Sequence, residues 1–110
     1  MKRDPAIRKS RVEALILKEV SEIIFSEIKD PRVQGTIISR VKVSDNMTKA
    51  TVYIVPQKDV KRHIEGLKSA AGFVRAILRK RVSMRILPTI SFEVDDEYAV
   101  PKEEEKDEKL

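Results

Sequence analysis

The sequence contains no cysteine and no tryptophan, and it has only three glycines among 110 residues. Without cysteine the chain has no disulfide, no thiolate metal ligand and no catalytic thiol, as is usual for a protein of a reducing compartment. With so few glycines it has no glycine-rich phosphate loop. No apolar run is long enough for a signal peptide or a membrane span. We therefore expect a cytoplasmic protein with no membrane association.

Side chains suited to catalysis are also scarce. His63 is the only histidine, and it stands in a helical pattern, where such a residue is usually exposed or half-buried. The acidic residues 95–97 could ligate a divalent cation, but we favour a solvated strand end. We expect no enzymatic activity, no metal, no cofactor and no small-molecule substrate.

Charge is abundant and unevenly distributed. Residues 1–94 contain 20 Lys and Arg against 10 Asp and Glu, whereas residues 95–110 contain 3 against 8. The composition predicts a basic domain over 1–94 and an acidic, disordered tail over 95–110. A strongly basic domain favours nucleic acid as its partner over a surface that is basic only for solubility.

Hydrophobic periodicity predicts the order helix, strand, strand, helix, strand. After an Asp4-Pro5 helix start, apolar residues recur at steps of three and four up to residue 28, and the pattern ends before Pro31. Residues 36–43 and 49–55 alternate around a polar turn and predict an antiparallel hairpin, with Ala50, Val52 and Ile54 of the second strand facing inward. A helix over about 59–81, capped by Asp59, and a strand over 86–94 follow.

These elements predict an α+β domain in which the helices cover one face of a three-stranded sheet. In the first strand Ile37, Val41 and Val43 should face the helices, and Arg40 and Lys42 should face water. In the last strand Ile86, Ile90, Phe92 and Val94 should point inward and Leu87 outward, with Pro88 at an edge position or an irregular strand start.

Gly72 lies inside the second helical pattern, where glycine is unfavourable. The apolar phase continues through it, which allows one unbroken helix. The small residues Ala70 and Ala71 before it also allow a break, at which free backbone N–H groups would face a phosphate. A third possibility is that the small residues pack closely on the first helix, and periodicity does not decide among these.

Basic residues cluster at the start of the first helix and after Gly72. No Asp or Glu occurs from Gly66 to Phe92, which favours an unpaired cationic surface that follows phosphates over a merely solvated helix face. The predicted RNA-binding residues are Lys68, Ser69, Ala70, Ala71, Gly72, Arg75, Arg79, Lys80, Arg81 and Arg85, with Arg8 and Arg11 on the first helix and Arg40 and Lys42 on the sheet.

Four segments, in this order and spacing, closely resemble the bacterial ribosome-binding factor A family: RVEALILKEVSEII, KDPRV, VKVSDNMTKATVYIV and LKSAAGFVRAILRKRVSMRILPTISFEVDD. The resemblance covers roughly residues 7–98. It implies a type II KH-like fold, helix-strand-strand-helix-helix-strand. In that fold an Ala-x-Gly kink, here Ala70-Ala71-Gly72, replaces the Gly-x-x-Gly loop that clamps nucleic-acid backbone in KH domains.

The resemblance also implies a role: binding the 30S subunit and its 16S rRNA during late assembly, including rRNA processing and growth in the cold. We expect a monomeric, non-enzymatic assembly factor. Two alternatives stay open, a generic single-stranded nucleic-acid binder and a protein-interaction module that docks an acidic protein. Co-sedimentation with 30S subunits, but not with 50S subunits or polyuridine, would separate them.

Overall fold

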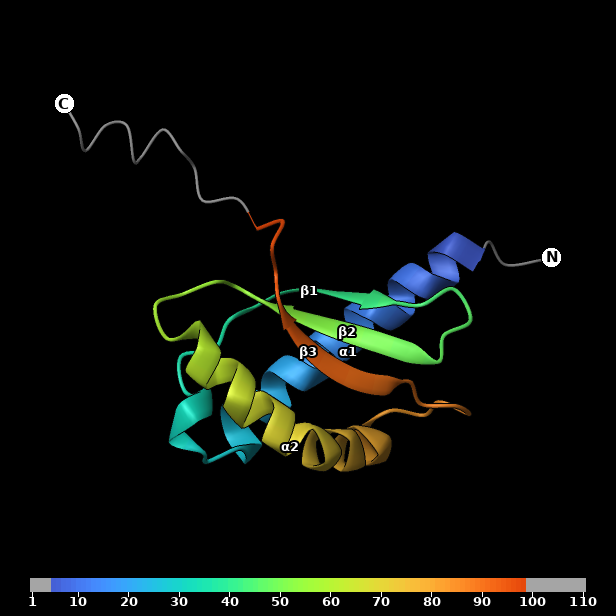
Figure 1. Ribbon diagram of the computed structural model, residues 1–110. Coiled ribbons are helices and arrows are strands. Elements are labelled where there is room, and N and C mark those ends of the chain that lie inside the picture. The colour runs from blue at the N-terminus through green and yellow to red at the C-terminus, as the bar shows by residue number, and fades with distance from the viewer. Residues whose placement is uncertain (1–4, 99–110) are drawn as a thin grey trace.

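The structure, a computed structural model, describes residues 5–98 as two layers, a three-stranded sheet with two α-helices on one face (Figure 1). The strand order is β1-β2-β3, with β1 and β2 antiparallel and β2 and β3 parallel. The elements are α1 (Pro5–Glu27), the 3-10 helix η1 (Pro31–Val33), β1 (Ile38–Val43), β2 (Lys49–Ile54), α2 (Val60–Arg81) and β3 (Thr89–Val94). The predicted α+β class, with helices on one face, is confirmed.

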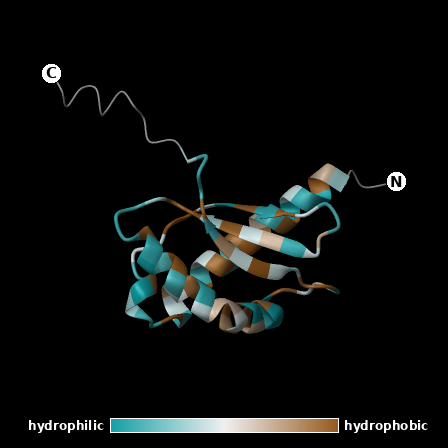
Figure 2. Ribbon diagram, in the orientation of Figure 1, coloured by the Kyte–Doolittle hydropathy of each residue, from teal (hydrophilic) through white to brown (hydrophobic). Residues whose placement is uncertain are grey.

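The core is aliphatic and lies between the sheet and the two helices. Its sheet side consists of alternate residues of the strands, because successive side chains of a strand point to opposite faces. Figure 2 shows hydrophobic residues on the part of α1 that lies behind the sheet. The fully buried members include Ile16, Val20, Ile23, Val43, Ala50, Val52, Ile54, Leu67, Val74 and Leu78. Burial of these predicted stripes is the main stabilisation of the fold.

The connection after α1 is held by its own side chains. The Asp30 carboxylate accepts a hydrogen bond from the Arg32 backbone N–H (2.9 Å) and pairs with the Arg32 guanidinium (2.7 Å). Pro31 begins η1, and Gly35 has a φ of +87°, which L side chains rarely adopt. The chain therefore turns sharply between α1 and β1, as the Asp-Pro pair predicts.

The start of β1 differs from the prediction. The pairing with β2 shifts register between Ile38 and Arg40. Such an irregularity reverses the faces of the residues before it. Ile37 is therefore 56% exposed and Ile38 packs against the core, so the prediction was right for Val41 and Val43 and wrong for Ile37.

The last strand is shorter than predicted. It begins at Thr89, directly after Pro88, which has no N–H to donate to a ladder. Ile90 and Phe92 point inward as predicted. Before the proline the alternation does not apply: Ile86 is 67% exposed and Leu87 is buried, opposite to the prediction.

The second helical segment is one helix. Residues Val60–Arg81 are α-helical without interruption at Gly72, so the predicted division into two helices is corrected to a single helix. In Figure 1 the axis of α2 changes direction about midway along its length, so the helix bends without being divided. The amides after Gly72 are inside the helix and are not the free N–H groups of a new helix N-terminus. Asp59 occupies the N-cap position, but its side chain makes no cap hydrogen bond.

The folded domain extends past the predicted boundary at Val94. The Asp95 backbone N–H donates to the Ile54 carbonyl (2.9 Å), and Asp95 is only 3% exposed. A solvated strand end at this position was therefore wrong. The remainder of the predicted acidic tail, from residue 99 onward, lies outside the described residues. In residues 5–98 neither helix combines the length and the apolar character that crossing a membrane would need.

Candidate nucleic-acid interface

Predicted RNA-binding residues line one face of α2 next to the edge strand β3. Lys68, Gly72, Arg75 and Arg79 are separated by steps of three and four and therefore share a helical face. Lys68 and Ala71 line a hollow whose other wall is Ile90, Ser91, Phe92 and Glu93 of β3. We call this hollow, with Arg75 and Arg79 beyond it, the α2–β3 groove. It places cations beside an unpaired strand edge.

The small residues before the groove have two different environments. Ala70 and Ala71 are partly buried and pack against the core, as close packing of small residues requires. A Cβ on Gly72 would meet nothing within 4 Å. Gly72 therefore leaves the surface of α2 open to a backbone that approaches from outside, while Ser69 stands exposed beside it.

Arg75 is fixed to the loop before β3. Its Nη2 donates to the Leu87 carbonyl (3.0 Å) and its Nε to the Pro88 carbonyl (3.3 Å). A guanidinium has five N–H donors, so these two bonds leave others for a ligand. Arg75 thus holds α2 against the chain entering β3 and places a fixed positive charge on the groove.

Arg81 is not part of an unpaired surface, although no acid is near it in the sequence. Its guanidinium pairs with three carboxylates of α1, those of Glu19 (3.4 Å), Glu22 (3.2 Å) and Glu27 (3.6 Å). The sequence prediction treated Arg81 as unpaired, and this premise was wrong because the pairing acids lie about sixty positions away along the chain. Arg81 joins the two helices.

Arg81→Gln should lower the free energy of unfolding by about 1 kcal/mol, because partly exposed ion pairs are weak singly but three share this guanidinium. The difference in the free energy of unfolding between this variant and the parent protein should shrink in about 1 M salt, where the screening length falls to roughly 3 Å. Urea unfolding at two salt concentrations measures this. Lys80→Gln is the matched control, and an equal effect of both substitutions would contradict the assignment.

The sheet residues Arg40 and Lys42 have different roles. Arg40 pairs with the buried Asp95 (Nε to Oδ2, 3.1 Å), lies 3.7 Å from a Glu97 oxygen, and stacks over the Tyr53 ring at 4.0 Å from its centroid. Its charge is balanced inside the protein. Lys42 is exposed on the same helix-free face and keeps its charge available.

Several of the predicted cations have no partner within the described part of the chain. No hydrogen bond or ion pair to residues 5–98 is formed by Lys68, Arg79, Lys80, Arg85, Arg8 or Arg11. All six are exposed. The structure brings Lys68 and Arg79 together with the groove, whereas Arg8 and Arg11 lie on the N-terminal half of α1, away from it.

Phe73 is a candidate that the sequence reasoning missed. It follows Gly72 and is 51% exposed. An exposed aromatic ring beside cations can stack on an unpaired base. Its position in the helical pattern could have indicated this exposure, because Phe73 lies off the apolar stripe that contains Val74 and Leu78.

His63 is structural. It is 6% exposed, not at the surface, and its Nδ1 lies 2.9 Å from the Arg32 carbonyl oxygen, to which a protonated Nδ1 donates. It therefore links α2 to η1. Among residues 5–98 no group of three or more His, Cys, Asp or Glu side chains is placed to hold a metal ion.

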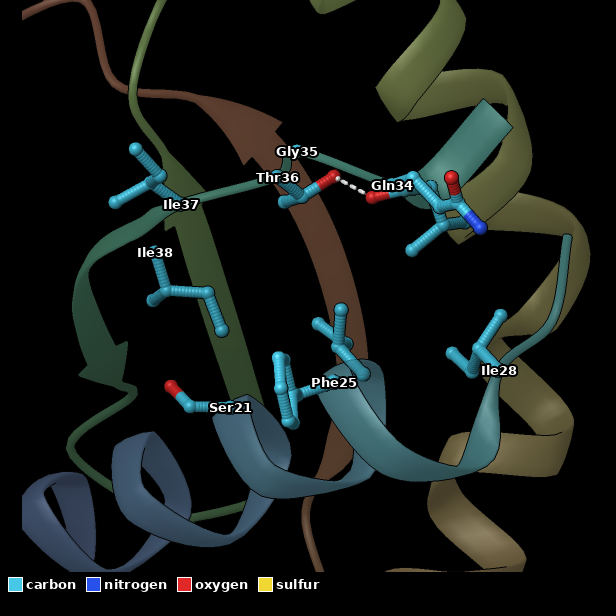
Figure 3. Close-up of a pocket in the computed structure, with 10 residues that line it drawn as sticks. Ser21, Phe25, Ile28, Gln34, Gly35, Thr36, Ile37 and Ile38 are labelled. Carbon is cyan, nitrogen blue, oxygen red and sulfur yellow. Dashed lines mark hydrogen bonds between the residues drawn. The ribbon is translucent and has the colours of Figure 1, made fainter. Parts of the chain in front are cut away.

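A second hollow, lined by both apolar and polar residues, lies between the end of α1 and the start of β1 (Figure 3). Phe25 on α1 is 92% exposed and Ile37 is 56% exposed at its rim. Figure 3 shows Ile28 and Ile38 around the same space, with the Thr36 hydroxyl bonded to the Val33 carbonyl (2.6 Å). No basic residue lines this hollow.

Comparison with known proteins places the chain in a family. A family model described as ribosome-binding factor A matches residues 8–108. The chain belongs to this family. Ribosome-binding factor A of Dictyoglomus thermophilum is 39% identical over 93 residues, which are 81% of this chain and 78% of that protein.

Solved structures of the family share the fold. The crystal structure of ribosome-binding factor A from Thermus thermophilus superposes with a TM-score of 0.76 at 25% identity, covering 83% of this chain and 99% of that one. A homology model of the Thermus thermophilus factor, fitted into a cryo-EM map of a 30S complex, has a TM-score of 0.67 at 24% identity, with coverages of 84% and 100%. The KH-like fold that the resemblance implied is confirmed.

Proposed function

We propose that this chain is a non-enzymatic assembly factor that binds the 30S subunit through its 16S rRNA during late maturation, including rRNA processing and growth in the cold. Membership of the ribosome-binding factor A family supports the ribosome as the target. The observation that carries the RNA contact is the α2–β3 groove. There Lys68 and Arg79 are exposed and unpaired within residues 5–98, and Arg75 is fixed beside them.

The groove would act by holding RNA backbone. Lys68 and Arg79, which lie about three helical turns apart, neutralise separate phosphates of the same strand and release their counterions. The open surface at Gly72 admits the sugar-phosphate chain, and Phe73 stacks an unpaired base. Binding favours one rRNA conformation over another only to the extent that its affinities for the two differ. No covalent step is needed for such a role.

The first experiment compares targets. Co-sedimentation at increasing salt should retain the protein on 30S subunits and not on 50S subunits or polyuridine. Equal retention on polyuridine would favour the generic single-strand binder instead. Failure to bind either subunit would refute the proposal.

The second experiment locates the site. Replacing Lys68, Arg79 and Lys80 together by Gln should weaken 30S binding about tenfold at about 0.1 M salt. It should also reduce the slope of log K against log salt by about one unit per lost phosphate contact. The matched control removes the same number of charges by replacing the exposed Lys58, Lys61 and Arg62, just before and at the start of α2, by Gln. If the control weakens binding as much, the effect is general charge and not the groove.

A protein-interaction role is the second candidate, and a different surface favours it. The hollow between α1 and β1 has exposed hydrophobic side chains, those of Phe25 and Ile37, at its rim, as docking sites often do. Phe25→Ser should leave RNA binding unchanged. If this substitution instead abolishes retention on 30S subunits while binding of isolated rRNA persists, a protein of the subunit is the principal contact.

A further inference from the structure

Three lysines from three different elements meet at a hollow that lies away from the α2–β3 groove. Lys9 comes from α1, Lys42 from β1 and Lys49 from the start of β2, and the hollow is completed by Val43, Ser44, Asp45 and Thr51. Figure 1 shows the N-terminal half of α1 lying beside the turn between β1 and β2. Of these cations the sequence reasoning selected only Lys42 as an RNA contact.

Strand register explains why the lysines converge. Lys42 is the cross-strand partner of Thr51, and Lys49 stands two residues before Thr51, so all three side chains lie on the helix-free face. The Glu13 carboxylate of α1 accepts a hydrogen bond from the Val43 backbone N–H (2.8 Å). This bond fixes α1 against β1, and Lys9, one helical turn before Glu13, then reaches the turn.

The charges in the hollow are incompletely balanced. Lys42 and Lys49 form no ion pair within residues 5–98. Lys9 pairs with Asp45 at 2.9 Å, but the Asp45 side chain is fully exposed, and such pairs contribute at most about 1 kcal/mol. The other nearby acid, Glu13, is engaged by the Val43 N–H.

The neutral groups leave one hydroxyl available. The Ser44 hydroxyl donates to Asn46 (2.8 Å) and accepts from the Lys49 N–H (3.0 Å), so it holds the turn. The Thr51 hydroxyl has no protein partner among residues 5–98, and Thr51 is the neighbour of both unpaired lysines on the helix-free face. Two ammonium groups beside a free hydroxyl suit a phosphate oxygen cluster.

We propose that this hollow, the hairpin site, binds a phosphodiester group of the RNA held by the α2–β3 groove, with Lys42, Lys49 and Thr51 as its contacts. The Asp45 carboxylate competes with the phosphate, because it pairs with Lys9 until a phosphate replaces it. The inference rests on the proposed function and adds a second, separate point of RNA contact. Two contacts on different elements fix the orientation of the protein on the RNA, which one groove alone cannot do.

Removing the lysines of the hairpin site and removing Asp45 should have opposite effects on RNA binding. Lys42→Gln with Lys49→Gln should weaken binding of 30S subunits and of isolated 16S rRNA several-fold and lower the salt slope by about one unit per lysine. Asp45→Asn should tighten binding about two- to fivefold, since it removes a repelling charge and frees Lys9. Lys58→Gln with Lys61→Gln is the control of equal charge change. Filter binding across a salt series measures all of these.

The outcomes separate this inference from the proposed function. If the hairpin variant binds like the parent while the α2 variant is weak, the hairpin site is refuted and the proposed function stands. If the parent does not bind 30S subunits, the proposed function fails, and the series with isolated 16S rRNA alone decides the hairpin site. If Asp45→Asn does not tighten binding, the competitor role of Asp45 is refuted.

Discussion

Asp95→Asn should lower the melting temperature by about 5–15 °C, since it breaks an ion pair whose carboxylate is buried. The Asp95 carboxylate accepts hydrogen bonds from the Ser39 hydroxyl (2.6 Å), from Arg40 Nε and Nη2 (both 3.1 Å), and from the Glu97 N–H (3.0 Å). An Asn amide is neutral, and its NH₂ group cannot accept a hydrogen bond. The substitution would leave Arg40 without its charge partner and would loosen the join between the end of β3 and β1.

The contribution of Asp95 to the stability of the fold should decrease at low pH. The hydrogen bonds from Arg40 and then from Ser39 lower the pKa of Asp95 from 3.8 to about 2. A lowered carboxyl pKa stabilises the folded state fully above the unfolded pKa, and this stabilisation disappears as pH falls through the folded pKa. The difference in stability between the parent and Asp95→Asn should therefore be constant above about pH 5 and shrink between about pH 4 and pH 2.

Thermal unfolding of both proteins across this pH range measures the effect. Asp96→Asn is the matched control, because Asp96 is an exposed neighbour that forms no ion pair within residues 5–98. It should change the melting temperature little. A difference between parent and Asp95→Asn that stays constant down to pH 2 would show that the ionised carboxylate is not what stabilises the fold.

Gly66→Ala should lower the free energy of unfolding by about 1–3 kcal/mol through overpacking. A Cβ on Gly66 would lie 2.8 Å from Val33 Cγ2 and 2.9 Å from Arg32 Cβ. Val33 is buried, and Arg32 is held by Asp30, so neither neighbour moves away freely. This crowding outweighs the gain of about 1 kcal/mol that alanine normally brings to a helix.

Gly72→Ala is the matched comparison, and it should change the free energy of unfolding in the opposite direction. Apart from its chain neighbours and the nearby backbone of its own helix, nothing lies within 4 Å of the Cβ it would add, so the helix propensity of alanine should raise the free energy of unfolding by up to about 1 kcal/mol. Urea unfolding of both variants measures the pair. If Gly72→Ala were as destabilising as Gly66→Ala, the bend of α2 would depend on Gly72. If it is stabilising but weakens 30S binding, Gly72 serves RNA approach.

Local sequence determined the elements and most of their buried faces. The three- and four-residue steps of α1 and α2 predicted their stripes, and strict alternation predicted Ala50, Val52 and Ile54 in the core. The same approach failed at Ile37 and Leu87, where a register shift and Pro88 end the alternation. Periodicity describes regular backbone, and it has no information on where that regularity stops.

The candidate site was only partly predictable for a related reason. The family resemblance and the basic stretch of α2 were enough to select Lys68, Arg79 and Lys80. Neither revealed that Arg75 bonds to the carbonyls before β3, that Arg81 pairs with α1, or that Arg40 pairs with Asp95.

Composition and periodicity thus determined that this chain is a basic α+β domain, and its motifs determined the family. Tertiary structure alone decided which charges are free. Whether a guanidinium is available to RNA depends on carboxylates and carbonyls that approach it from distant positions of the chain. The approach of Glu19 to Arg81, of Asp95 to Arg40, and of Lys9 to the hairpin follows from how the helices pack on the sheet. Distances of this kind have no counterpart in the spacing of residues along the sequence.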